Sequence, residues 1–161
     1  MICLLPERAK EIQRFRKNPW FFQQTFKTPS KDLKRFVSTC LEPFSFQAGI
    51  LSLETVVFEP KNLLSLLTRN SLQADNYRYL AIRAEGQESI STLLEAALGD
   101  SVDFAFVAFP KSLAIYADHD EYTTFYTRNL RALKSISGSL EEVGFEPVLG
   151  YVRGSARDKK R

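Results

Sequence analysis

The hydrophobic pattern of residues 76–152 alternates between the two-residue period of strands and the three-to-four-residue period of helices. Two stretches have the helical period, at 86–99 and 122–143. The strand-like stretches lie at 77–83, 103–109, 112–116 and 145–152. The resulting order is strand, helix, strand, strand, helix, strand, which is the order of ferredoxin-like folds. The sequence therefore predicts an α+β domain with an antiparallel sheet and its helices on one face.

The preceding residues extend this arrangement. A β-branched stretch at 50–58 predicts an extra strand, and Pro60 opens a helix that stops near Asn70. The first 42 residues read as helices, with one clear amphipathic stripe formed by Leu33, Phe36, Val37, Cys40 and Leu41. We therefore expect a basic helical N-terminal arm over 1–42, packed on an α+β domain over 43–153. A disordered basic tail is expected over 154–161.

Charge is divided unevenly along the chain. Residues 1–36 carry nine Lys and Arg against three Asp and Glu, whereas residues 37–152 carry eight against fifteen. Residues 153–161 carry five against one, so the net charge of +3 hides two basic ends around an acidic middle. Such asymmetry indicates that the ends meet a polyanion or an acidic surface.

The basic N-terminal segment also interleaves aromatic residues with its cations over 15–27. This combination suits single-stranded nucleic acid, where rings stack on bases and cations follow the backbone. It equally suits a protein interface, a homodimer contact through Trp20-Phe21-Phe22, or rings that simply dock the segment onto the sheet. The residues expected to bind nucleic acid or a partner are Arg14, Arg16, Lys17, Trp20, Phe22, Lys31, Lys34 and Arg35.

The tetrapeptide Asp118-His119-Asp120-Glu121 contains the single histidine of the chain. Its side chains could form a divalent-metal site, or His119 could act with a carboxylate as a general acid and base. The competing interpretation is a capping box, because Asp118 and Glu121 have the spacing of an N-cap and its N3 partner. In that interpretation the cluster starts the long helix expected over 122–143.

The stretch Phe104-Ala105-Phe106-Val107-Ala108-Phe109 resembles the second part of the RNP1 motif of RNA-recognition modules. The resemblance covers six residues and implies sheet aromatics that stack on bases, with Tyr77 and Tyr79 as further stackers. Val102-Asp103 stands where that family has a basic residue and a glycine. Alternation in a half-buried strand explains the same pattern, and we favour this interpretation.

Several classes of site have no signature in the chain. With one histidine, zinc motifs such as HExxH cannot form, and no phosphate-binding glycine loop or nucleophile elbow is present, so we expect no cofactor. Cys3 and Cys40 show no paired spacing, and no run approaches the length of a membrane span. A cytoplasmic protein with two free thiols is therefore expected.

Three functional hypotheses follow. The first is a non-catalytic binding protein that engages nucleic acid or a nucleoprotein through its basic ends. The second is an adaptor or immunity-type inhibitor whose acidic middle faces a basic protein. The acidic candidates are Glu85, Glu88, Glu95, Asp100, Asp103, Asp118 and Asp120. The third is a small metal-dependent hydrolase at residues 118–121.

Overall fold

The computed structural model of the protein describes residues 1–5, 20, 22–74, 77 and 80–151. Within these residues the chain forms eight strands and four helices. The strands are β1 (Ile2–Leu5), β2 (Phe22–Lys27), β3 (Ala48–Thr55), β4 (Ala81–Glu85), β5 (Asp103–Phe109), β6 (Leu113–Ala117), β7 (Tyr122–Thr127) and β8 (Pro147–Val148). The helices are α2 (Leu33–Leu41), α3 (Lys61–Arg69), α4 (Gln87–Gly99) and α5 (Leu130–Glu142).

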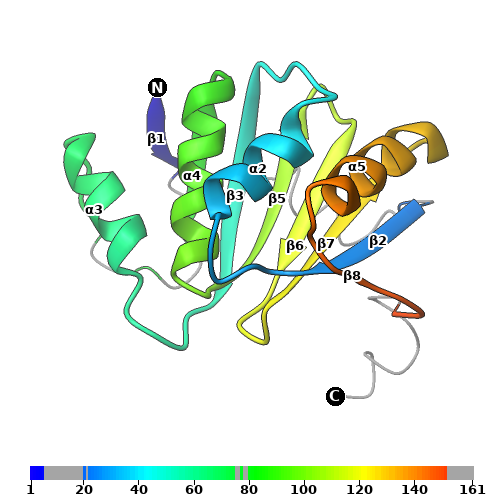
Figure 1. The fold of residues 1–161 in the computed structure, drawn as a ribbon. Helices are drawn as coiled ribbons and strands as arrows, with labels where there is room; N and C mark the ends of the chain where they lie inside the picture. Colours follow the sequence, from blue (N-terminus) through cyan, green and yellow to red (C-terminus); the bar gives the residue numbers. More distant parts are fainter. Residues whose placement is uncertain (6–19, 21, 75–76, 78–79, 152–161) are drawn as a thin grey trace.

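All eight strands join one antiparallel sheet in the order β1-β4-β3-β5-β6-β7-β2-β8. The four helices lie over one face of this sheet (Figure 1). The predicted α+β fold with an antiparallel sheet is therefore confirmed. The ferredoxin-like order is not confirmed, because β3 lies between β4 and β5 and the chain adds strands at both ends of the sheet.

The main core lies between the helices and the sheet. Apolar stripes of α2, α4 and α5 meet the large side chains of the sheet, among which Phe26, Phe104 and Phe125 are fully buried. The ring of Phe125 packs against Phe26 at 6.1 Å and against Phe36 of α2 at 5.9 Å, measured between ring centroids. Each fully buried side chain of this kind stabilises the fold by about 1.5–3 kcal/mol relative to exposure. The ring of Phe36 thus anchors α2 to the sheet.

Gly49 of β3 makes room for one of these rings. A Cβ atom at this position would overlap the ring of Phe106 on the neighbouring strand β5. The central pair of strands therefore depends on a residue without a side chain at position 49.

A second apolar cluster lies on the other face of the sheet. Its buried members are Ile50, Ala105, Val107, Ala114 and Tyr126. Residues of β1, β5 and β6 and the indole of Trp20 pack against them. The central strands therefore carry apolar residues on both faces, which explains the nearly continuous apolar run in β5.

The helix expected over 122–143 is wrong in its first part. Residues 122–127 form β7, and α5 begins only at Leu130, where the Asn129 side chain accepts a hydrogen bond from the N–H of Ala132 at 2.7 Å. Three threonines in β7, Thr123, Thr124 and Thr127, are buried. Their branched side chains favour a strand, and this preference outweighs the helix-like spacing of the aromatic residues between them.

The helical arm expected over 1–42 is also wrong in part. Helix α2 lies on the predicted stripe, but 2–5 and 22–27 are strands of the sheet. Ile2–Leu5 pairs with β4, and Phe22–Lys27 pairs with both β7 and β8. The described part of this segment is therefore built into the sheet, because both strands find their partners far along the sequence.

Two predicted strands are displaced or shortened: β4 covers Ala81–Glu85 instead of 77–83, and β8 covers Pro147–Val148 of the expected 145–152. Several other predicted elements agree with the structure. Helices α3 and α4 and strand β5 lie where their periodicity places them, and β6 is the hairpin partner of β5. Gly144 ends α5 with a φ of 96°, and Pro147 lies in an edge strand as predicted. Strand β3 ends at Thr55, three residues before the predicted end at Phe58.

Asp100 joins two of the helices. Its carboxylate accepts hydrogen bonds from the backbone N–H groups of Asn62 at 2.9 Å and Leu63 at 2.8 Å, in the first turn of α3. The residue that precedes this turn is Pro60, which has no side-chain cap of its own. Burial raises the pKa of Asp100, and the two N–H groups oppose this rise. Asp100 is therefore a structural cap supplied from the end of α4.

Candidate functional site

The aromatic residues expected to stack on nucleic acid pack onto the sheet. Trp20 lies against the second apolar cluster, with the guanidinium of Arg128 5.3 Å from its ring centroid. Phe22 packs against the main core on the opposite face. Both rings therefore dock onto the sheet, which was one of the alternatives that the sequence left open. Because they lie on opposite faces, Trp20 and Phe22 do not form one shared patch for a homodimer contact. Arg14, Arg16 and Lys17 lie outside the described residues.

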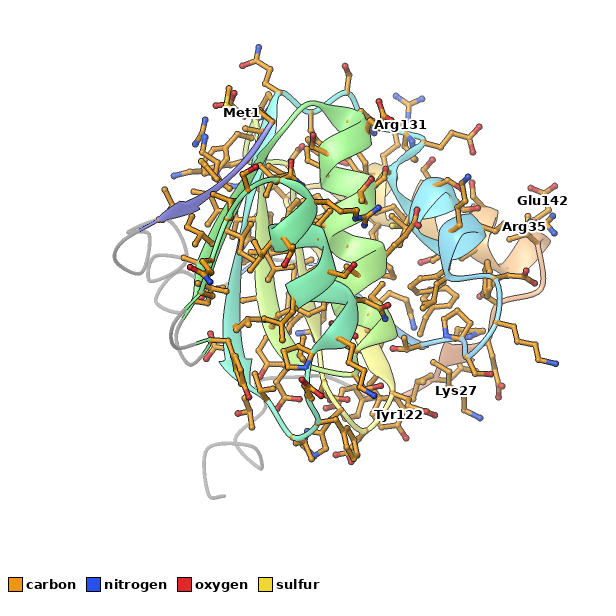
Figure 2. All side chains as sticks on the ribbon, turned by 90° about the vertical axis from the view of Figure 1, so that its left-hand side faces the viewer. Met1, Lys27, Arg35, Tyr122, Arg131 and Glu142 are labelled. Carbon is orange, nitrogen blue, oxygen red and sulfur yellow. The ribbon has the colours of Figure 1, made fainter. Side chains whose placement is uncertain are left out.

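The remaining predicted cations lie on or beside α2. Lys31, Lys34 and Arg35 are exposed. Figure 2 places Arg35 on the same side of the molecule as Glu142 of α5 and Lys27 of β2. The Lys27 ammonium lies 3.2 Å from the Glu146 carboxylate. Folding thus brings carboxylates of the acidic middle beside cations of the basic N-terminal segment, so charge is less segregated on the surface than along the sequence.

Two of the three RNP1-like aromatics cannot stack on bases, and the third, Phe109, packs partly buried against the second apolar cluster. Phe104 and Phe106 are completely buried in the main core beneath the helices. Tyr77 packs against the same core, and Tyr79 lies outside the described residues. The resemblance therefore reflects a buried central strand, as its alternation indicated.

The tetrapeptide 118–121 forms the turn between β6 and β7. The Asp118 carboxylate accepts a hydrogen bond from the Tyr122 N–H at 3.1 Å, and the Asp118 N–H donates to the Tyr122 carbonyl at 3.0 Å. Glu121 has a φ of 67°, in the left-handed region. The predicted capping box is therefore wrong: Asp118 does bind a backbone N–H downstream, but it closes a hairpin turn and starts no helix.

Two contacts fix this turn to neighbouring strands. On one side, Asp103 Oδ1 of β5 accepts the His119 backbone N–H at 2.7 Å and lies 2.8 Å from His119 Nδ1. On the other side, the Glu121 carbonyl accepts the Thr28 N–H at 2.7 Å, just after β2. The turn is consequently held between elements on either side of the hairpin, which gives its side chains defined positions.

His119 is surrounded by negative charge. The hydrogen bond to Asp103 and the charge of that carboxylate raise the pKa of His119, and the charges of Asp120 and Asp118 add to this. Its Nε2 lies 3.8 Å from Asp120 Oδ1, and the ring is 39% exposed. Asp103 is only 13% exposed, so its interaction with His119 is screened less than a surface pair.

The turn does not gather metal ligands. In the described part of the chain, no group of three or more His, Cys, Asp and Glu side chains is arranged to hold a metal ion. Asp118 is directed to its own backbone turn, and His119 faces a single carboxylate on β5. The metal-dependent hydrolase hypothesis therefore receives no support from the geometry of 118–121.

Exposed apolar side chains lie at the same end of the sheet. Val57 and Phe58, in the loop after β3, are 50% and 62% exposed. This loop follows Thr55, which pairs with Asp103, and both the loop and the β6–β7 turn lie at the lower edge of the sheet in Figure 1. We define the acidic rim as Val57, Phe58, Glu59, Asp103 and residues 118–122. It combines carboxylates from three separate segments with two exposed apolar side chains.

The acidic candidates from the sequence divide between several places. Asp103, Asp118 and Asp120 belong to the acidic rim, whereas Glu85 pairs with Ala48 at the opposite end of β3, and Glu88 follows in α4. Asp100 is buried as the cap of α3. Val57 and Phe58 were missed because the strand was expected to continue to residue 58, whereas β3 ends at Thr55. The Glu59-Pro60 pair was the signal in the sequence that the strand ends earlier.

No family model, curated protein or solved structure matches this chain. Among the helices of the described residues, none has the length and apolar character required to cross a membrane.

Proposed function

We propose that this protein binds a partner protein with a basic surface through the acidic rim, in the manner of an adaptor or inhibitor. The proposal rests on one observation: carboxylates from three segments and the exposed side chains of Val57 and Phe58 lie at the same end of the sheet. Exposed apolar groups bordered by charge are typical of surfaces that bind another protein.

The two components of the rim have different roles. Carboxylates at Glu59, Asp120 and Glu121 attract a positively charged surface and set its orientation, which affects the association rate most. Phe58 supplies the apolar area that disappears from water when the complex forms, and such anchors provide most of the binding energy. Because Asp103 and Thr28 already hold the turn, little ordering is required when the partner binds.

Nucleic acid is a less suitable ligand for this end of the molecule. Phosphates would be repelled by the rim carboxylates, and Trp20 and Phe22 are packed against the sheet. The nucleic-acid hypothesis retains the exposed cations Lys31, Lys34 and Arg35 together with the basic residues outside the described part of the chain. It stays a prediction, and the experiment below distinguishes it from the proposal.

The test is a titration of isotope-labelled protein followed by backbone amide NMR shifts. The probes are a peptide that alternates arginine and leucine, an oligo-lysine of equal length, and single-stranded DNA and RNA oligonucleotides. We expect the arginine-leucine peptide to shift residues 57–59 and 118–122 and to bind more tightly than oligo-lysine, since it offers both charge and apolar area. Oligonucleotide shifts centred on Lys31, Lys34 and Arg35, with none at the rim for either peptide, would contradict the proposal.

Matched variants distinguish binding at the acidic rim from a general effect of the protein's net charge. Phe58→Ser should remove the preference for the arginine-leucine peptide, and Asp120→Lys should weaken both peptides. Glu88→Lys changes the net charge equally on another element and should leave both unaffected. Tyr151 stacks on Tyr122 at 5.6 Å, and the basic residues 153–161 follow it in sequence. These basic residues could compete with the peptides for the rim carboxylates. The titration is therefore repeated with a chain that ends at Tyr151, and the difference in peptide affinity measures this competition.

A further inference from the structure

The two edges of the sheet are protected very differently. The edge strand β8 has two residues, one of which is Pro147, and proline and short length both discourage pairing with another chain. The opposite edge strand β1 has the sequence Ile2-Cys3-Leu4-Leu5, with no charge and no proline. Figure 2 looks onto this edge and shows β1 on the near side of the molecule beside α3. Within the described residues, the edge at β1 therefore lacks the usual guards against strand addition.

We propose that two copies of this chain pair antiparallel through β1, so that their sheets continue into one another across a two-fold axis. A second copy suits this edge because an antiparallel pair of identical strands is self-complementary. The strand is uncharged, so no like charges on β1 itself meet across the axis. The inference concerns the β1 edge, which shares no residue with the acidic rim, and it stands independently of the proposed function.

The hydrogen bonds to β4 determine which groups β1 offers to a partner. The Glu85 N–H donates to the Met1 carbonyl at 2.8 Å, and the Met1 amino group donates to the Glu85 carbonyl at 3.2 Å. In an antiparallel ladder such doubly bonded pairs alternate with unbonded pairs. Cys3 opposite Arg83 and Leu5 opposite Ala81 therefore also bond to β4. The N–H and C=O groups of Ile2 and Leu4 point to the open edge.

This alternation selects one register. If Ile2 of each copy lies opposite Leu4 of the other, all outward groups of both residues in both copies are paired. An axis at Leu4 would instead place Ile2 opposite a position beyond Leu5, where β1 ends. A two-fold axis at Ile2 would leave the outward N–H and C=O groups of Leu4 with no residue of the second copy opposite them. The register with the two-fold axis at Cys3 therefore makes the most hydrogen bonds.

The chosen register has two consequences for side chains. Cys3 faces Cys3 of the second copy in an unbonded pair, where Cα atoms are about 4.5 Å apart. That separation lies within the range of about 4.4–6.8 Å that a disulfide spans. Met1, which is 74% exposed, lies opposite Leu5 of the second copy and loses its contact with water. Cys3 thus reports the register, and it is a free thiol on β1.

Sedimentation and oxidation together test the inference. We expect the protein to dimerise with rising concentration and to form a Cys3–Cys3 disulfide with oxidised glutathione, each bond converting one oxidised glutathione to two thiols. Cys3→Ser should keep the dimer and lose the cross-link. Cys3→Lys should raise the dimer Kd about tenfold or more, because it places two like charges directly opposite each other.

Further cysteine variants distinguish a cross-link set by the strand register from one formed by random collision of two chains. In the Cys3→Ser background, Leu5→Cys should not cross-link to itself, since the two copies of residue 5 lie four residues apart along the strands. A Cys40→Ser variant should cross-link like the native chain, because Cys40 is buried. A monomer at every concentration overturns the inference. So does a dimer that Cys3→Lys leaves intact, or one in which the Leu5→Cys variant cross-links as readily as the native chain.

Discussion

Replacement of Asp100 by alanine tests how α3 and α4 are held together. The change removes the carboxylate that accepts the N–H groups of Asn62 and Leu63, at 2.9 and 2.8 Å. Loss of a helix cap costs about 1 kcal/mol. The backbone of buried Leu63 also loses its partner, and an unsatisfied buried donor costs about 1–3 kcal/mol. We expect Asp100→Ala to lower the free energy of unfolding by about 2–3 kcal/mol.

Urea and thermal unfolding measure this loss. For a chain of this size, each kcal/mol lowers the Tm by about 2–4 °C, so the expected shift is about 4–12 °C. Asp100→Asn keeps one acceptor oxygen and should lose about 1 kcal/mol. Glu88→Ala, in the exposed first turn of α4, serves as the control and should stay within about 0.5 kcal/mol of the native chain. If Asp100→Ala also stays within that range, the carboxylate does not hold α3 in place.

Two further predictions concern the β6–β7 turn and the central strands. His119, the single histidine, should titrate by ring-proton NMR above its ordinary pKa of 6.5 and move back toward it in Asp103→Asn. Because the pKa of His119 is raised in the folded state, the contribution of this residue to stability is complete below about pH 6.5 and is lost as the pH rises through the raised value. If the pKa of His119 is the same in Asp103→Asn as in the native chain, this reasoning is refuted. Gly49→Ala should cost about 1–3 kcal/mol in chemical unfolding, because its Cβ overlaps Phe106. Adding Phe106→Leu should recover part of that loss, and a neutral Gly49→Ala would show that the ring has room to move.

The sequence predicted elements whose pattern is local. Strand β5 and helix α4 have a clear period over many residues, and both lie where they were expected. Strand β7 was misassigned because Tyr122, Phe125 and Tyr126 share the helical spacing of the α5 stripe that follows. The buried branched residues Thr123 and Thr124 between them were the contrary signal, and burial cannot be read from spacing alone.

Strands β1 and β2 depend on distant partners. Ile2 pairs with Ala84 and Thr25 pairs with Thr124, so neither strand has a nearby residue that could reveal it. The candidate site has the same character. Asp103 and His119 meet only because β5 and β6 pair, and Phe58 is exposed only because β3 ends at Thr55. Composition identified an acidic middle, but the fold decided which of its carboxylates share a surface.

The most direct test of the central claim is photo-cross-linking in the native host. A photoreactive phenylalanine derivative is placed at Phe58 in the acidic rim or at Leu130, an exposed apolar residue beyond the opposite end of β7. We predict a protein adduct at position 58 that disappears when Asp120→Lys is added, and no comparable adduct at position 130. Equal adducts at both positions, or adducts at 58 that the charge reversal leaves unchanged, would contradict the account.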